Sequence, residues 1–430
     1  MRDFMSTMNM FRFLFLLLPF SIASYLNAEP LWAYPGYLWH EALLLSNELQ
    51  ADSLLVLASA ERLSASGRLP DPMLRFGYSP HPLETRNGPV DYTLTISQKI
   101  PWPGSMTASR REMEQLHQIS EVESEIEALE LRTEITALWG RMYLTRQEIT
   151  LLTDKMQRLA HLTEIANVRY RSDQASLETL LLLENRSVMT ESRRMAAELL
   201  LQSQRAELSS ILGYEDFQLA WPDSVPAEDY FLESAAIVPL MDSMPRIRRS
   251  RLISGARYAA ADAAAAGAYP SFEVGATWSM VGEPEIEMGA VDPGEDGLMV
   301  FAGLNLPLGY SGTGSRSNAA FLSAGASDYM LQQTTADRIA ERTALVNRLT
   351  ALADMLVVYR ETVIPNYEAI YELSITRWIS STGDVERVIE NLGDLEDARL
   401  EETRIYAEIV SVYAELMQLD GRTTEKGEFL

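Results

Sequence analysis

The chain has 430 residues, of which 47% are hydrophobic and 23% charged, which is enough apolar content for a large core and excludes a disordered chain. Its formal net charge of −25 argues against nucleic acid as a partner, because phosphates are bound by basic surfaces. Such charge suits a surface or pore that handles cations, and equally a protein kept soluble by its acidity. The chain contains no cysteine, which excludes disulfides and thiolate metal sites.

The N-terminus has the pattern of a secretory signal peptide. Arg2 and Arg12 flank a mostly uncharged start, the apolar run 13–20 follows, and small or polar residues continue through Ala28. We predict a signal peptide over residues 1–28, cleaved after Ala23 or after Ala28, with an uncleaved anchor as the alternative. Elsewhere no run approaches the ~20 apolar residues that a spanning helix needs. A membrane-inserted mature chain would therefore have to use a β-barrel.

The rest of the chain divides into two similar halves, residues 29–221 and 222–430. Each half contains a helix, a proline, two strands joined by a loop, and then two very long helices. The landmarks recur at an offset of roughly 200 residues: Pro72 matches Pro270 before a strand, and Leu212-Gly213 matches Asp420-Gly421 at the end of each half. This pattern indicates an internal two-fold duplication.

Four segments alternate between apolar and polar or small residues, at 74–79, 92–97, 272–279 and 298–306. A period of two predicts strands with one apolar and one polar face. The last segment is less regular, because Met299 and Phe301 fall on its nominally polar face. Four strands are too few to close a membrane barrel, which needs at least about eight, so a barrel would require several copies of the chain.

Long helices are predicted over 105–169, 175–212, 315–377 and 385–419. The first contains no proline and only one glycine, and at 1.5 Å per residue it would extend about 100 Å. Leu131, Ile135, Leu138 and Met142 are spaced by four, three and four residues, the spacing of a coiled-coil seam. Helices of this length favour coiled-coil packing over an ordinary globular core.

Several of these segments together resemble the TolC-like outer-membrane efflux factors. The segments are Arg68–Leu74 before the first strand, Ser97–Gly104 between strand and helix, the helical tip Tyr170–Ser176, and Val363–Pro365. The resemblance extends from about Trp39 to Gly421. Each segment alone is moderately specific, whereas their duplicated order is highly specific. The stretch from Ile100 to Gly104 and Val363–Pro365 look more like the heavy-metal branch, of Cus and Czc type, than like the drug-exporting branch.

The resemblance implies an α+β membrane protein that works as a homotrimer. Three chains would give a twelve-stranded β-barrel in the lipid of the outer membrane, continued by an α-helical tunnel through the periplasm. The tunnel would meet a periplasmic adaptor protein and an inner-membrane efflux pump, and the chain itself would have no catalytic activity and no cofactor. The tips expected to contact the adaptor comprise Tyr170, Arg171, Ser172, Asp173, Trp378, Ser381 and Gly383.

The chain departs from the family at two places. Asp173 and Ser381 stand where the family usually has glycine, although Gly383 lies near the second tip. The family often narrows its periplasmic end with acidic rings just after that tip, where this chain has Asp384, Arg387 and Glu390 as candidate gate residues. Arg387 breaks a double acidic ring, while three copies of Glu390 would still attract cations. Glu390 could also be an ordinary solvated carboxylate.

No catalytic constellation is present. The histidines His40, His81, His117 and His161 are scattered, and the sequence contains no metal-binding His-Glu-x-x-His and no Gly-x-Ser-x-Gly motif. The function predicted from sequence is a passive channel of a tripartite export system. The alternatives are a secreted structural coiled-coil protein, which would have no use for the four strands, and a periplasmic adaptor, which would lack the long duplication.

Overall fold

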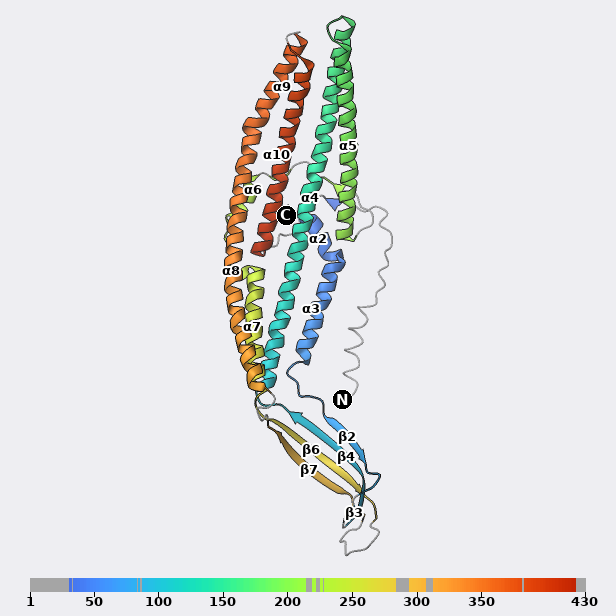
Figure 1. Cartoon of the computed structure of the whole chain (residues 1–430), viewed down its shortest axis with the longest axis vertical. Helices are drawn as coiled ribbons and strands as arrows, with labels where there is room; N and C mark the ends of the chain where they lie inside the picture. Colours follow the sequence, from blue (N-terminus) through green and yellow to red (C-terminus); the bar gives the residue numbers. More distant parts are fainter. Residues whose placement is uncertain are drawn as a thin grey trace.

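The chain forms an elongated rod with a small β-sheet at one end and long helices along the rest of its length (Figure 1). The computed structural model describes residues 31–32, 34–82, 84–85, 87–213, 219–221, 225–226, 228–283, 294–306, 312–380 and 383–422. The predicted signal peptide, residues 1–28, lies outside the described residues. Within them, no helix is both long and apolar enough to cross a bilayer.

The sheet contains the four predicted strands in the order β2-β4-β6-β7, and every neighbouring pair is antiparallel. The short β3, Glu84–Thr85, pairs with the beginning of β4. The outer strands β2 and β7 each have one unpaired edge within the described chain. The bounds are β2 Met73–Tyr78, β4 Gly88–Ile100, β6 Ser271–Val281 and β7 Gly297–Asn305.

The register gives the sheet one continuous apolar face. One row across the four strands consists of Leu74, Ile96, Ala276 and Val300, and the next consists of Phe76, Leu94, Trp278 and Leu298. Leu74 and Val300 are 67% and 78% exposed, so no described residue covers this face. The alternation predicted from sequence is therefore confirmed at the level of whole rows.

The opposite face of the sheet consists mostly of polar or small residues. Thr95 and Thr277 lie in register and their hydroxyls are hydrogen-bonded at 2.9 Å. Met299 and Phe301 interrupt this face, as the sequence indicated. The ring of Phe301 lies over Gly275, where an added Cβ would come within 2.5 Å of the Phe301 Cζ atom. The glycine thus makes room for the aromatic ring against the sheet.

The long helices confirm the predicted lengths. Helix α4, Ser105–Arg171, has 67 residues, and α5, Leu177–Leu212, runs back along it. The other long segment consists of α8, Thr313–Val358, a π-helical turn at Tyr359–Val363, and α9, Ile364–Ile379, after which α10, Val385–Asp420, returns. The π-helical turn comes just before Pro365, which has no N–H for a regular helical hydrogen bond.

Shorter helices extend the two returning helices toward the sheet. In Figure 1, α3, Asn47–Ala65, continues the direction of α5, and α7, Pro245–Ala266, continues that of α10. The two returning helices end alike, because Gly213 and Gly421 are both left-handed, with φ of 72° and 70°. An ideal Cβ on Gly421 would lie 2.6 Å from the Pro245 Cδ atom, so the end of α10 abuts the start of α7.

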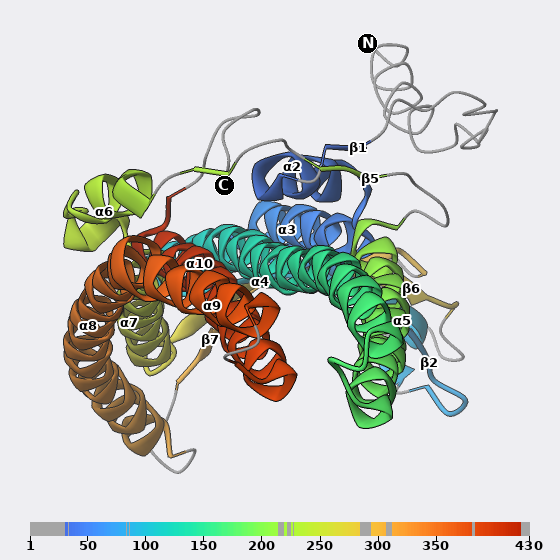
Figure 2. The same cartoon turned by 90° about the horizontal axis from the view of Figure 1, so that it is seen from above.

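The middle of the rod carries a short outer layer. It consists of α2, Pro35–Leu45, α6, Glu228–Ala235, the 3-10 turn Met241–Ser243, and β1, Leu31–Trp32, paired in parallel with β5, Leu219–Ala220. Viewed from above, α2 and α6 lie on one side of the curved wall of long helices (Figure 2). Leu38 of α2 and Phe231 of α6 are buried in the same core as Leu138 and Ile409 of the long helices.

Candidate functional site at the helical tips

The first helical tip joins α4 to α5 through a tight turn. The amide of Asp173 donates to the carbonyl of Tyr170 (3.1 Å), and that of Gln174 donates to the carbonyl of Arg169 (2.8 Å). These are the two hydrogen bonds of a Schellman motif, in which the residue after the helix cap is left-handed and usually glycine. Asp173 has that conformation, with φ of 55°, and is the one non-glycine residue with positive φ in the described chain.

The residues predicted to contact an adaptor are exposed at the first tip, whereas the tryptophan of the second tip is buried. At the first tip, Tyr170 is 43% exposed, and Arg171, Ser172 and Asp173 are exposed too. Ser176 caps α5 by accepting a hydrogen bond from the amide of Thr179 (3.2 Å). This tip offers a polar surface with one aromatic ring to a partner.

The second tip buries its tryptophan. Trp378 is only 4% exposed, so its ring is not available for the partner contact expected of it and belongs to the core of the tips. Ser381 lies outside the described residues. Gly383 is exposed, and an added Cβ there would come within 3.0 Å of the Trp378 backbone nitrogen. A larger residue at 383 would be tightly packed against the end of α9.

A direct contact between the two tips could not be predicted from the sequence. The Arg169 guanidinium lies over the Trp378 ring, 5.6 Å from its centroid, and donates to the carbonyl oxygens of Trp378 and Ile379. Lysine and arginine near a helix C-terminus commonly bind the last carbonyls of that helix. Here the arginine at the end of α4 binds the end of α9, 209 residues further along the chain, and only the fold reveals this pairing.

A second contact between the same two hairpins, an ion pair, lies further from the tips. Lys155 of α4 forms an ion pair with Glu396 of α10, and both side chains are mostly buried. Burial raises the pKa of Glu396 to about 6, although Lys155 acts to lower it. Beside this pair, the Arg158 guanidinium lies 5.3 Å from the centroid of the Tyr371 ring. These polar and cation–π contacts join the α4–α5 hairpin to the α9–α10 hairpin, and the two hairpins also share an apolar core.

The three candidate gate residues occupy the start of α10. Asp384 is the N-cap, and its carboxylate accepts a hydrogen bond from the amide of Glu386 (3.3 Å). Arg387 and Glu390 are both exposed, and the structure shows no ion pair between these two described residues. Asp384 therefore caps the helix, whereas Glu390 is an exposed residue of its second turn.

Glu390 lines a cavity of about 470 Å³ between α4, α5 and α10. The α10 side of this cavity is acidic, with Glu386, Glu390 and Asp397. The facing α5 side is basic, with Arg186 and Arg193, and Arg387 is not among the lining residues. The structure thus brings Glu390 into a charged groove between the two hairpins, which the sequence alone did not indicate.

No metal-binding cluster accompanies these residues in the described part of the chain. The described part of the chain holds no group of three or more His, Cys, Asp or Glu side chains placed to hold a metal ion. The histidine at 117 accepts or donates a hydrogen bond with the Ser59 hydroxyl at 2.7 Å and lies 3.6 Å from Glu121, a local arrangement between α3 and α4.

No protein-family model and no curated protein matches this sequence. Solved structures of outer-membrane channels, in contrast, match over nearly its whole length. CusC matches with a TM-score of 0.75 at 13% identity, covering 93% of this chain and 95% of that one. The outer membrane protein VceC from Vibrio cholerae gives 0.72 at 14%, covering 90% and 96%. The Campylobacter jejuni CmeC outer membrane channel gives 0.69 at 16%, covering 92% and 87%.

The chain therefore has the TolC-like outer-membrane channel fold. The four antiparallel strands continued by long helices are the common architecture, and they confirm the fold class predicted from sequence. At identities of 12–16%, the likeness shows the fold, and function has to be argued from the features of this chain.

Proposed function

We propose that this protein is the passive outer-membrane channel of a tripartite efflux system. The observation that carries the proposal is the four-stranded sheet, which has one mostly apolar face that no described residue covers and two outer edges without a partner in the described chain. A monomeric soluble protein rarely exposes such a surface, whereas a transmembrane barrel needs it against lipid. Strands β4 and β6, with 13 and 11 residues, are long enough to cross a bilayer.

Two aromatic clusters lie at the two ends of the sheet, as expected of side chains at membrane interfaces. At the end with the strand loops, Tyr92 stacks with Tyr78 and Phe76, at centroid distances of 5.2 and 5.9 Å. At the helical end, Trp102 stacks with Tyr269 and Phe272, at 5.3 and 6.0 Å. The apolar face between them would be the lipid-contacting band of the outer membrane.

The free edges support a homotrimer. Because β2 and β7 run antiparallel within the alternating sheet, β7 of one copy can pair with β2 of the next. Three copies would give twelve strands, and their curved helical walls would enclose a periplasmic tunnel. With 67 residues, α4 would extend about 100 Å from the membrane. The tips would then contact a periplasmic adaptor protein and, through it, an inner-membrane pump that supplies the energy.

Two narrower proposals concern the kind of substrate that is transported and the division of the chain into two repeats. The resemblance to the heavy-metal branch rests on the stretch from Ile100 to Gly104 and on Val363–Pro365, and the similar TM-scores of 0.69–0.75 favour no branch. Residues 29–221 and 222–430 are proposed as repeats, supported by the same order of helix, two strands and two long helical segments in each. Removal of residues 1–28 as a signal peptide is proposed from sequence.

Negative-stain electron microscopy of the detergent-extracted protein tests the channel directly. We expect three-fold particles with a tube about 100 Å long beyond the detergent belt, together with discrete conductance steps in planar bilayers. Soluble rods without a belt, found in the periplasmic fraction, would support the alternative of a secreted coiled-coil protein. The uncovered apolar sheet face favours the channel, since a soluble rod would have to hide it.

A further inference from the structure

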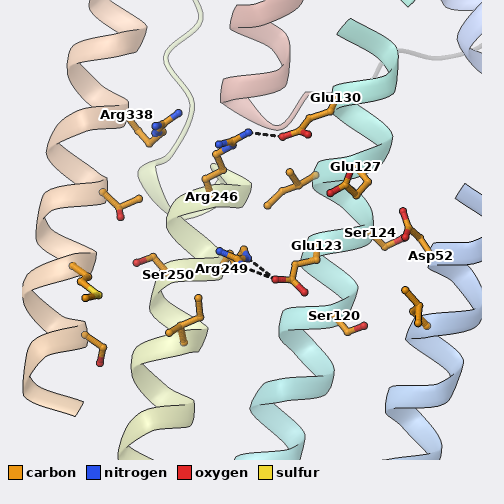
Figure 3. Close-up of a pocket in the computed structure, with 16 residues that line it drawn as sticks. Asp52, Ser120, Glu123, Ser124, Glu127, Glu130, Arg246, Arg249, Ser250 and Arg338 are labelled. Atoms are coloured by element: carbon orange, nitrogen blue, oxygen red, sulfur yellow. Dashed lines mark hydrogen bonds and ion pairs between the residues drawn. The ribbon is translucent and has the colours of Figure 1, made fainter. Parts of the chain in front are cut away.

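A second cavity lies midway along the rod, far from the helical tips, where α3, α4, α7 and α8 pass side by side (Figure 3). Its volume is about 640 Å³, within the range of roughly 300–1,000 Å³ of sites that bind small molecules. The four helices come from both halves of the chain, so the cavity exists only in the folded whole. No residue of the candidate tip site lines it.

Two α4 carboxylates that line the cavity, Glu123 and Glu130, lie toward the concave face of the helical wall, away from the outer layer of helices. The indole nitrogen of Trp39 on α2 donates to the carbonyl oxygen of Ala128 (3.2 Å), which marks the side of α4 covered by the outer layer. At about 100° per residue, Glu123 and Glu130 lie about 200–220° around α4 from Ala128. They therefore point away from α2 and α6, which lie together on the convex side in Figure 2. In the proposed trimer this concave face is the wall of the tunnel.

Three arginines of the cavity already have carboxylate partners. Arg246 pairs with Glu130 and Arg249 with Glu123 (2.6 Å), both across the α4–α7 contact (Figure 3). Arg338 pairs with Glu341 (2.5 Å), outside the cavity lining. The first two pairs join α7 to α4, the third lies within α8, and together they leave little positive charge for a ligand.

Two further carboxylates have no cation partner among the described residues. The Oδ2 atom of Asp52, on α3, is buried without any hydrogen bond. Glu127 lies exposed at the mouth of the cavity, and its pKa is raised by partial burial and by the negative charges of Glu130, Asp52 and Glu48, against the opposing effect of Arg246. Because a buried oxygen without a partner is costly, a bound cationic donor would satisfy Asp52 and relieve the repulsion at Glu127.

The remaining lining suits an organic rather than a bare metal cation. Leu55, Ile253 and Met330 add apolar surface, of which Leu55 and Met330 are 58% and 66% exposed. Hydrated metal ions gain nothing from such surface, and the described residues hold no group of three or more side chains placed to ligate one. An amphiphilic cation, in contrast, can place its charge between two carboxylates and its body on the apolar side chains.

We propose that this cavity is a binding site for amphiphilic organic cations, with Asp52 and Glu127 recognising the charge. The inference rests on the proposed function for its location in the tunnel, since cargo passing along the concave wall would reach it. It deepens that function by naming a cargo class. A cation-binding wall site would raise the local concentration of such cargo without trapping it, because the cavity is open on one side.

Ethidium, a planar organic cation, is a suitable probe. We expect its fluorescence anisotropy to report binding to the detergent-solubilised full chain, and the double variant Asp52→Asn, Glu127→Gln to weaken that binding roughly tenfold, the effect of losing two partly screened charge contacts. Leu55→Ala should weaken binding by a smaller factor. The matched control is Glu121→Gln, which removes an exposed carboxylate of the same helix that does not line the cavity.

Equal ethidium affinity of the wild type and the double variant would overturn the proposal, as would equally tight binding of the anionic dye fluorescein. Circular dichroism of each variant separates loss of the site from loss of the fold. Conductance is measured on the same preparation. If the chain binds ethidium through Asp52 and Glu127 but forms no pores, the proposed channel function is contradicted and the proposed binding site is supported. If it forms pores but does not bind ethidium, only the proposed binding site is contradicted.

Discussion

At the scale of single residues, Asp173 is the clearest sign of local strain. A left-handed conformation costs an L-residue about 1–2 kcal/mol relative to glycine, with aspartate at the lower end of that range. Asp173 adopts it, with φ of 55°, in a turn whose two hydrogen bonds are both formed. We therefore expect Asp173→Gly to stabilise the first tip by about 1 kcal/mol, seen as a higher urea midpoint or a slower hydrogen exchange at residues 165–176.

Ser172→Gly is the control for this prediction. Ser172 has φ of −105°, so glycine there relieves nothing, and its hydroxyl hydrogen bond to the Val168 carbonyl (3.1 Å) would be lost. Exchange at the tip should become faster in this variant. If both glycine variants changed exchange in the same direction, strain at Asp173 would not be the cause.

Glu396 predicts a pH dependence of stability. Burial raises its pKa from 4.5 to about 6 in the folded chain, so between these pH values the folded state holds a proton that the unfolded state releases. Stability from this group is therefore present at low pH and lost as the pH rises through 6, by up to about 2 kcal/mol. From pH 4 to pH 7 the unfolding free energy of the wild type should therefore fall by about 2 kcal/mol relative to that of Glu396→Gln.

The comparison with Glu396→Gln removes the background from the many other carboxylates, which titrate in both proteins. Glu184→Gln, at an exposed site of α5, is the matched control and should leave the wild-type profile unchanged. A constant difference between wild type and Glu396→Gln over the whole range would mean that Glu396 ionises normally. The Lys155 ion pair would then fully offset the burial of its partner.

At the scale of elements, the ends of the two returning helices can be compared directly. Gly213 and Gly421 share a left-handed conformation, but their surroundings differ. Among the described residues, an added Cβ on Gly213 would meet the Leu45 carbonyl oxygen alone, at 3.4 Å. On Gly421 it would lie 2.6 Å from the Pro245 Cδ atom and 2.9 Å from the Ser243 carbonyl oxygen. Gly213→Ala should cost about 1 kcal/mol and Gly421→Ala clearly more.

Thermal unfolding followed by circular dichroism ranks the two variants. The informative result is their order, because both carry the same backbone penalty and only the contact with Pro245 separates them. Equal losses would show that the end of α10 can move away from α7 without cost. That outcome would contradict the close contact between these stacked helices.

The elements themselves were largely predictable from the sequence, and their pairings were not. Prolines and glycines mark where helices and strands begin and end, and period-two or coiled-coil spacing distinguishes the two types between those marks. The π-helical turn at Tyr359–Val363 leaves no such mark apart from Pro365. The contacts Arg169–Trp378 and Lys155–Glu396 join residues that are 209 and 241 positions apart in the sequence. No local sequence pattern predicts contacts between residues so far apart.

The same distinction applies to the candidate gate. The sequence placed Asp384, Arg387 and Glu390 on one helix start, and the structure assigns them different surroundings. Asp384 caps α10 because an N-terminal carboxylate binds free amides there, which is predictable from its position. The groove that separates Glu390 from Arg186 and Arg193 depends on how the two hairpins diverge, which is a property of the whole assembly of helices.

At the scale of the whole molecule, the acidic charge and the groove at the tips lead to one prediction about conduction. With a formal net charge of −25, the proposed channel should prefer cations even before the gate is considered. In a trimer, three copies of Glu390 would come near the axis at the narrow periplasmic end, where charges of one sign act strongly on passing ions. Glu390→Gln should therefore lower the cation preference measured as a reversal potential across a KCl gradient.

Arg387→Gln, one turn earlier on the same helix, should shift the reversal potential the other way, since it removes a positive charge near the same opening. Both shifts should be larger near 0.1 M KCl than near 1 M, because the screening length falls from about 10 Å to about 3 Å. Unchanged selectivity in Glu390→Gln at low salt, with an intact Arg387→Gln response, would place Glu390 outside the ion path. The acidic side of the groove would then serve contact between the hairpins, or with an adaptor, instead of conduction.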